Sequence, residues 1–185
     1  IPIRSSYILQ LHRDLYQYSQ KDIGGRFKNT QNVIAENHPD GSRTVRFTPL
    51  APYETPGAID SICDNFNQAI DACIVDPLVL IPIFINDFLC IHLFNDGNGR
   101  MSRLLTTLLL YRCGYVVGRY ISLESKIEKT KENYYDVLER CGISWHENEN
   151  DPSPFIKYLL GIVLAAYRDF ETRISLVDDK LPAIE

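Results

Sequence analysis

The residues whose types and spacing could do chemistry lie within one dozen positions, where the sequence reads HLFNDGNGRMSR from His92 to Arg103. Gly97 and Gly99 flank Asn98, and two glycines so placed let the backbone curl until successive N–H groups converge. A helical pattern follows at once, and a helix start adds unpaired N–H donors and the positive end of the helix dipole. We therefore expect Gly97, Asn98 and Gly99 to form an anion-binding nest that holds phosphate.

The charged side chains of the same segment extend this interpretation. Arg100 and Arg103 are three positions apart, so we expect both guanidinium groups on one side of the first helical turn, facing two or three phosphates. Asp96 at the edge of the nest could bind Mg²⁺ together with phosphate oxygens. His92, with an ordinary pKa near ~6.5, could take a proton from a hydroxyl group. Phe94 is expected to anchor the loop in the core.

Each of these features also has a purely structural explanation. A histidine at a helix end is commonly a cap, a Gly-x-Gly triplet is a common turn, and an arginine pair commonly lies on the surface. Their joint occurrence in one segment, directly between two strongly apolar helical patterns, favours a site for a polyphosphate. The lysine of GxxxxGK[ST], the spacing of GxGxxG and the strand that precedes both signatures are missing.

The segment from His92 to Arg103 resembles the signature of the Fic family, H-P-F-x-[D/E]-G-N-G-R-x-x-R. The one departure is Leu93, where the family usually has proline, and this change removes no reacting group. The likeness extends over roughly residues 20–170, because a Gly-Gly-Arg-Phe segment, a hairpin, a proline-rich stretch and a tyrosine pair stand in the family's order. The resemblance implies the Fic fold, a mainly α-helical (all-α) bundle with one short β-hairpin flap.

The resemblance also implies an activity. Fic enzymes are typically protein adenylyltransferases, which transfer AMP from ATP to a Ser, Thr or Tyr hydroxyl of a target protein and release pyrophosphate. Carried over by position, His92 is the general base, Asp96 is the Mg²⁺ ligand and Arg103 holds the γ-phosphate. The other expected phosphate ligands, through backbone, amide and guanidinium donors, are Gly97, Asn98, Gly99 and Arg100. The expected partner is a target protein with an exposed hydroxyl residue, and a copy of this chain could serve as one.

Two more sets of residues follow from the resemblance. Tyr135 matches a position that lines the adenine pocket and Tyr134 stands beside it, although a tyrosine pair on an amphipathic helix also fits simple core packing. The predicted hairpin resembles the family's flap, which holds the target by adding it as an extra strand. The apolar flap residues, half of which should face the core, are Val33, Ile34, Val45 and Phe47.

The type of transfer and its regulation stay open at this point. In a phage-derived toxin of the same fold, lysine replaces the residue at the position of Gly97 and the γ-phosphate is transferred, so glycine here favours adenylylation. Asp96 argues in the same direction against phosphocholine transfer. The alternatives are a de-AMPylase or a phosphotransferase of the same fold, or a non-catalytic nucleotide-sensing module of a larger regulator. The inhibitory helix of many relatives, [S/T]-x-x-x-E-[G/N], has no match here, and we expect it upstream of Ile1 or on another chain.

The elements that must position these residues are mainly helices. Apolar residues at helical spacing predict helices over residues 5–18 (with serine at the cap), 58–74, 78–91, 100–113 and 155–174. Asp76 supplies the cap, and Pro77 the first turn, of the helix predicted over residues 78–91. A charged region that begins at Ser122 or Ser125 and continues past Tyr134 predicts one more helix. Two β-type runs, 33–35 and 44–47, around a Pro-Asp-Gly turn predict the hairpin.

Composition bounds the remaining functions. The 185 residues, 45% of them hydrophobic, suit one domain, 1–185, which we expect to be a piece of a longer chain because it opens Ile1-Pro2 and its one methionine is Met101. The net charge of −5 gives no general attraction to nucleic acid, which we expect only through a domain outside this chain. The longest apolar stretch, residues 78–93, is too short and too polar to cross a membrane. Five cysteines without metal-ligand spacing predict reduced thiols in a cytoplasmic protein.

Overall fold

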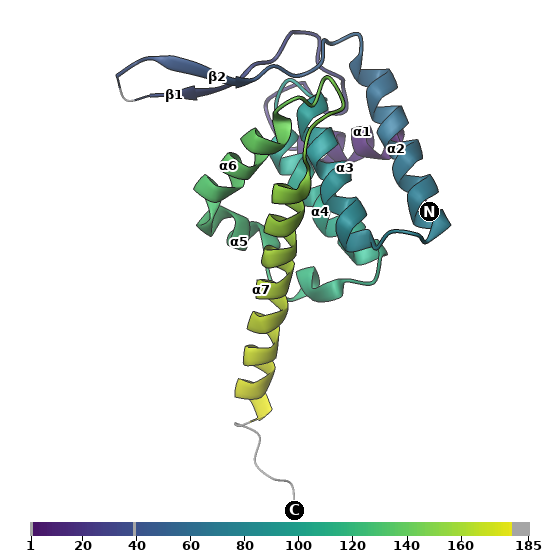
Figure 1. Ribbon diagram of the computed structural model, residues 1–185, viewed down its shortest axis with the longest axis vertical. Helices are drawn as coiled ribbons and strands as arrows, with labels where there is room; N and C mark the ends of the chain where they lie inside the picture. Colours follow the sequence, from purple (N-terminus) through teal and green to yellow (C-terminus); the bar gives the residue numbers. More distant parts are fainter. Residues whose placement is uncertain (1, 39, 179–185) are drawn as a thin grey trace, which may run out of the picture.

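The architecture is mainly α-helical in a computed structural model that describes residues 2–38 and 40–178. The predicted fold class, helices with one two-stranded hairpin, is confirmed within these residues. The elements in chain order are α1 (Ser5–Leu15), β1 (Ile34–Asn37), β2 (Arg43–Phe47), α2 (Thr55–Ala72), α3 (Pro77–Ile91), α4 (Asn98–Arg112), the 3₁₀-helix η1 (Val116–Arg119), α5 (Leu123–Lys129), α6 (Lys131–Gly142) and α7 (Ser153–Asp178). The hairpin projects beyond the helices at one end of the molecule, and α7 extends past them at the other (Figure 1).

The centre of the bundle is α3, which contacts α2, α4, α6 and α7. As predicted, Asp76 caps it, because its carboxylate accepts from the N–H of Leu78 at 2.8 Å, and Pro77 occupies its first position. The buried apolar side chains of α3 include Ile81, Phe84, Ile85, Phe88 and Ile91. A helix packed against so many neighbours holds its C-terminal end rigidly, and the functional segment begins there.

A short loop joins α3 to α4 and ends in a left-handed glycine. Gly97 has a φ of 89° and is followed by Asn98, the first residue of α4. The N–H of Met101 donates to the Gly97 carbonyl at 2.8 Å, so the helix begins two residues before the predicted start. Leu105 and Leu109 are fully buried and fasten α4 to the core. The loop is therefore held at both ends by buried helices.

The charged region that begins at residue 122 forms two helices rather than the one predicted. α5 ends at Lys129, Thr130 leaves the helical path with φ of −119° and ψ of 29°, and α6 begins at Lys131. The Thr130 hydroxyl donates to the carbonyl of Lys126 at 3.1 Å and lies 2.7 Å from the phenol oxygen of Tyr158 in α7. A threonine hydroxyl bonded back to the preceding turn bends a helix, which explains the break.

Of the two predicted serine caps, the one at the start of α5 is confirmed and the one at the start of α1 is wrong. Ser122 caps α5 as predicted, since its hydroxyl accepts from the N–H of Ser125 at 3.1 Å. The serine cap of α1 is wrong, because Ser5 is already helical and Arg4 occupies the cap position without a side-chain bond. This helix is held by burial instead, because Ile8 is fully enclosed in the core.

The hairpin is confirmed, with strands slightly offset from the predicted ones. Ile34 pairs with Phe47 and Ala35 with Val45, with an irregularity in register between Ile34 and Ala35. Val33 precedes the first strand. Val33 and Val45 are exposed, whereas Ile34 and Phe47 are partly buried. Burial along β2 does not alternate as in a regular strand, because its first three residues are exposed and its last two are partly buried.

Two compositional expectations can be compared with the described residues. None of the helices found in residues 2–38 and 40–178 combines the length and the apolar character needed to cross a membrane. The thiols are free: Cys63, Cys90 and Cys141 are buried, Cys113 is partly buried and Cys73 is exposed.

Candidate active site

The loop between α3 and α4 is closed by the side chain of Asn98. Its Oδ1 accepts from the N–H of Phe94 at 2.9 Å, and its Nδ2 donates to the Phe94 carbonyl at 2.7 Å. Phe94 is fully buried and stacks on the ring of His12 at 3.6 Å, so it anchors the loop as expected. The amide of Asn98 is used inside the loop and is buried, which corrects the expectation that it binds phosphate; backbone N–H groups remain available for that role.

The back of the loop is covered by α1 and the segment after it. A Cβ at Gly97 would lie 2.9 Å from the hydroxyl oxygen of Tyr16 and 3.3 Å from Nε2 of His12. His12 Nε2–H donates to the carbonyl of Asp96 at 3.0 Å, and its Nδ1 accepts from the N–H of Gly25 at 3.0 Å. Burial lowers the pKa of His12, which favours this neutral form. The sequence analysis did not predict this support of the loop by α1. The Gly24-Gly25 pair was the signal that could have indicated it, because glycines let the backbone approach a neighbouring helix closely.

His92 follows α3 in a left-handed conformation with φ of 53°. Its Nδ1 lies 3.3 Å from the carbonyl of Leu89, and because a carbonyl only accepts, Nδ1 carries the proton. Nε2 has no hydrogen-bond partner among the described residues and is free to accept a proton. Burial, helped by the charge of Lys28 and opposed by the bond to Leu89, lowers the pKa of His92 to about 4. The imidazole is therefore neutral at physiological pH, as a general base must be.

A cavity of about 810 Å³ opens in front of His92, between the hairpin, α3, α4 and α6. The predicted site residues that line it are Val33, Ile34, Phe47, His92, Gly99, Arg103, Tyr134 and Tyr135. The predicted site residues outside its lining are Val45, Asp96, Gly97, Asn98 and Arg100. Lining residues that sequence reasoning missed include Glu36, Arg46, Asn86, Leu89, Cys90, Leu138, Glu139 and Gly142. The structure thus brings the predicted general base, one arginine, the helix start and the tyrosine pair together.

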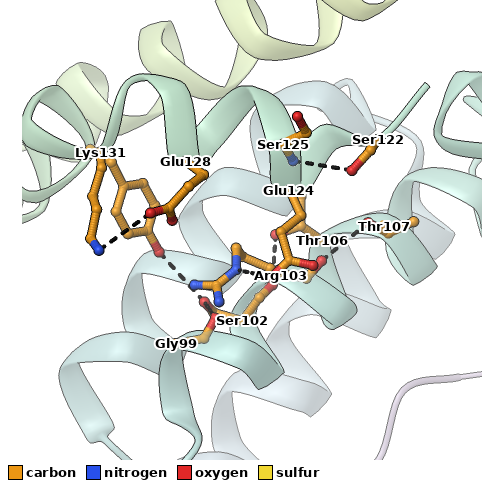
Figure 2. Close-up of polar contacts among 11 residues, drawn as sticks. Gly99, Ser102, Arg103, Thr106, Thr107, Ser122, Glu124, Ser125, Glu128 and Lys131 are labelled. Carbon is orange, nitrogen blue, oxygen red and sulfur yellow. Dashed lines mark hydrogen bonds and ion pairs between the residues drawn. The ribbon is translucent and has the colours of Figure 1, made fainter.

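Arg100 and Arg103 diverge, which corrects the expectation that both face one ligand. Arg100 lies over the ring of Tyr16 at 4.8 Å, donates to its hydroxyl and approaches the carboxylate of Asp96 at 3.6 Å. Arg103 lies on the cavity side, where its Nε donates to Glu124 at 2.9 Å (Figure 2). The start of α4 lies between the segment after α1 and α5, so each arginine meets a different neighbour.

Asp96 lies on the loop outside the cavity lining, and its carboxylate is 2.6 Å from the ammonium of Lys21. The hydrogen bond from Lys21 holds the pKa of Asp96 below its ordinary value, so the group is charged. The described residues hold no group of three or more potential metal ligands among His, Cys, Asp and Glu. Mg²⁺ typically uses one or two carboxylates and completes its shell with phosphates and water, so a single charged, half-exposed Asp96 fits that kind of site.

The two tyrosines differ in what they could offer a ligand. Tyr134 is buried, packs against Phe155 and Tyr158, and has its hydroxyl 3.5 Å from that of Ser102. Burial raises its pKa to about 12, and its role is mainly core packing. Tyr135 is 50% exposed and lines the cavity, so its ring is available for stacking.

Arg46 and three carboxylates form the rim of the cavity between the hairpin and α6. Arg46 donates to Glu36 at 2.5 Å within the hairpin and to Glu139 of α6 at 2.6 Å, with Asp136 at 3.9 Å. This arrangement ties the flap to α6 across the cavity. Because these carboxylates repel phosphate, a polyphosphate is favoured beside Arg103, which also lines the cavity but does not belong to this group.

Comparisons with known proteins point to the same family as the motif from His92 to Arg103. The Fic/DOC family matches residues 2–110 of this chain. The chain is similar to the protein adenylyltransferase Fic of Aedes aegypti, at 26% identity over 155 residues that cover 82% of this chain and 26% of that protein. It is similar to the protein adenylyltransferase fic-1 of Caenorhabditis elegans, at 28% identity over 154 residues, 82% of this chain and 25% of that protein. The chain therefore spans about a quarter of the length of these curated relatives.

Solved structures with a similar fold carry Fic domains as well. A Fic domain containing signaling protein from Bacteroides thetaiotaomicron matches with a TM-score of 0.69 and 29% identity, over 89% of this chain and 60% of that chain. A Fic family protein from Desulfovibrio desulfuricans G20 matches with a TM-score of 0.73 and 25% identity, over 97% of this chain and 49% of that chain.

Proposed function

The chain belongs to the Fic/DOC family, and from this premise we propose that it is a protein adenylyltransferase that transfers AMP from ATP to a Ser, Thr or Tyr hydroxyl of a target protein. One observation carries the proposal. Nε2 of His92, which has no hydrogen-bond partner in residues 2–38 and 40–178, shares a single cavity with Gly99 at the start of α4 and with Arg103. A base and a phosphate-binding end in one cavity are the two parts that such a transfer requires.

The transfer can be written with the groups of this cavity. His92 Nε2 accepts the proton of the target hydroxyl while the hydroxyl oxygen bonds to the α-phosphorus of ATP. The bond from the α-phosphorus to the oxygen bridging to the β-phosphate breaks, and pyrophosphate leaves with that electron pair. The N–H groups at the start of α4 and the side chain of Arg103 would stabilise the phosphate charges. Arg100, turned toward Tyr16, would act by holding Asp96 and the loop.

We further propose Asp96 as the residue that holds Mg²⁺ with the phosphates. The support is its charged carboxylate on the loop that leads into α4. When bound, the ion would neutralise phosphate charge and so favour departure of pyrophosphate. Lys21 and Arg100 would then no longer be the principal partners of this carboxylate.

The proposal also covers target docking and the surroundings of the chain. The hairpin would bind an extended target segment along an edge, with Val33 and Val45 as its exposed apolar side chains. An inhibitory helix on another segment or chain would supply a carboxylate that pairs with Arg103. The hydrogen bond that Arg103 donates to the Glu124 carboxylate supports this part of the proposal. Free cysteines support a cytoplasmic location.

Labelling with radioactive ATP tests the proposal. We expect that the protein, Mg²⁺ and a cell lysate transfer label from α-labelled ATP to proteins, and that His92→Ala abolishes transfer while binding ATP as the wild type does. Equal labelling by His92→Ala would exclude the role given to His92. Transfer of label from γ-labelled ATP alone would identify a phosphotransferase. Release of AMP from labelled proteins would identify a de-AMPylase, and ATP binding without any turnover would identify a nucleotide-sensing module.

A further inference from the structure

Asn86 of α3 is a buried amide without a hydrogen-bond partner. Its side chain is 1% exposed, and neither Nδ2 nor Oδ1 has a partner among the described residues. Nearly all buried polar side-chain atoms in folded proteins are paired, because an unpaired one has lost its bonds to water without replacement. Both atoms of this amide are therefore available to a group that the chain itself does not supply.

The position of Asn86 relates it to the proposed site. It lines the same cavity as His92 and lies six residues before it on one continuous helix, about 9 Å along the axis. The next residue, Asp87, accepts from Nε1 of Trp145 at 2.8 Å, and the Trp145 ring meets the ring of Phe47 edge-on at 6.2 Å. Asn86 thus belongs to the end of the cavity that lies under the hairpin.

The side chains at this end suit a flat, uncharged group. Phe47, Cys90 and Leu138 line the cavity, and α6 contributes Gly142, which has no side chain. A Cβ at Gly142 would lie 3.2 Å from the Phe47 ring, so the aromatic ring occupies the space next to the bare backbone. Apolar and aromatic walls with one convergent polar group are typical of a site for a ring ligand.

The charges of the cavity orient a nucleotide within it. The phosphates are favoured beside Arg103 and the start of α4 rather than beside the carboxylates that pair with Arg46, so the base is directed away from the start of α4, toward the part of the cavity under the hairpin that Asn86 lines. We propose that Asn86 determines nucleotide specificity by binding the adenine ring, with Nδ2 donating to N7 and Oδ1 accepting from the 6-amino group. Guanine has acceptors at both of these positions, so it would leave Oδ1 unpaired. This inference rests on the proposed function, because it assumes that the cavity binds ATP.

Binding to the intact protein provides the test. We would measure the affinities of the non-hydrolysable imido analogues of ATP and GTP, in the presence of Mg²⁺ and without target, by calorimetry. We expect that the wild type prefers the ATP analogue and that Asn86→Leu lowers its affinity for that analogue about 10-fold while affinity for the GTP analogue is unchanged. Asn65→Leu is the matched control, since Asn65 is an exposed asparagine of α2 outside the cavity lining.

Thermal unfolding of the ligand-free variants separates recognition from folding. Replacing an unpaired buried amide by a similar apolar side chain should keep or raise the midpoint temperature, so Asn86→Leu should be at least as stable as the wild type. If leucine is not accommodated, Asn86→Ala should show the same loss of preference for the ATP analogue.

The outcomes distinguish this inference from the proposed function. Binding of neither analogue by the wild type contradicts the proposed function and, with it, the role of Asn86. If the wild type and both Asn86 variants bind the ATP analogue with the same preference over the GTP analogue, the inference about Asn86 is overturned while the proposed function stands. If Asn86→Leu and Asn86→Ala keep the wild-type affinity for both analogues but no longer label target proteins, the amide contacts the target instead, and the inference is overturned as well.

Discussion

Lys28 holds the peptide groups on both sides of His92. Its backbone N–H donates to the carbonyl of Leu93 at 2.9 Å, and its Nζ donates to the carbonyl of Ile91 at 3.0 Å. The side chain is 3% exposed, and burial lowers the pKa of Lys28 to about 8. A residue 64 positions earlier in the chain therefore fixes the backbone from which the proposed general base projects.

Lys28→Met should slow AMP transfer more than it weakens ATP binding. Methionine keeps the apolar stem but loses the bond to the Ile91 carbonyl, so His92 would be held less firmly, and small displacements of a reacting group are costly. We expect the labelling rate to fall about 10-fold at saturating ATP with little change in affinity. Lys157→Met, at an exposed lysine of α7, is the control. A variant with the wild-type rate would remove Lys28 from the positioning of His92.

His92 should remain neutral in mildly acidic solution. Because burial lowers its pKa to about 4 from an ordinary value of 6.5, we expect its ring to resist protonation until the pH approaches 4. The unfolded chain binds this proton first, so the contribution of His92 to the free energy of unfolding decreases as pH falls from 6.5 to 4. Titration of the histidine ring signals by NMR, with His92→Ala for assignment, is the measurement. A midpoint near 6.5 for His92 would contradict the burial argument.

Removing the carboxylate of Glu124 should strengthen ATP binding. Glu124 pairs with Arg103 at 2.9 Å and competes for the guanidinium that we propose for the γ-phosphate (Figure 2). An exposed ion pair typically contributes about 0.2–1 kcal/mol, so Glu124→Gln should raise the affinity about 1.4- to 5-fold. Glu128→Gln is a matched control one turn along α5, where the carboxylate pairs with Lys131 instead. Equal affinities for the two variants would place Arg103 outside the phosphate site.

Gly97→Ala should destabilise the fold. The residue has a φ of 89°, and a Cβ there would lie 2.9 Å from the Tyr16 hydroxyl oxygen, so strain and a close contact combine. We expect the free energy of unfolding to fall by about 1–3 kcal/mol in urea titrations. Gly161→Ala in the middle of α7 has open space and should instead stabilise by about 0.5–1 kcal/mol. If Gly97→Ala and Gly161→Ala had the same free energy of unfolding, tight packing of Tyr16 and α1 against the loop would be contradicted.

Asp96→Asn should raise the Mg²⁺ concentration required for labelling. Asparagine keeps the shape of the side chain but removes the charge that a hard cation needs. We expect the concentration for half-maximal rate to rise at least about 10-fold, with ATP binding in the absence of the ion preserved. Asp22→Asn, at an exposed carboxylate that pairs with Arg26, should have the wild-type requirement. An unchanged requirement for Asp96→Asn would show that Asp96 does not hold the ion.

Most elements of the fold could be predicted from the sequence, because their signals are local. Asp76 and Pro77 mark the start of α3 within two residues, and the turn between 35 and 44 marks the hairpin. The break at Thr130 could not be predicted this way, because neither glycine nor proline marks it in the sequence. Its hydroxyl bonds back to the preceding turn and also contacts Tyr158 in α7, a partner 28 positions away that spacing along the chain does not indicate.

The sequence by itself determined which kind of site to expect, since the spacing of glycines, arginines and one histidine around a helix start predicts a phosphate-binding loop from short-range signals alone. Only the tertiary structure decided which groups face the cavity. Packing of α1 and the following segment against one side of the loop draws Arg100 to Tyr16, while Arg103 lies toward α5 on the other side. The support of His92 by Lys28 and the unpaired amide of Asn86 likewise depend on segments far apart in the chain. Periodicity and motif spacing describe neighbours along the chain, whereas side-chain partners are set by how the helices pack.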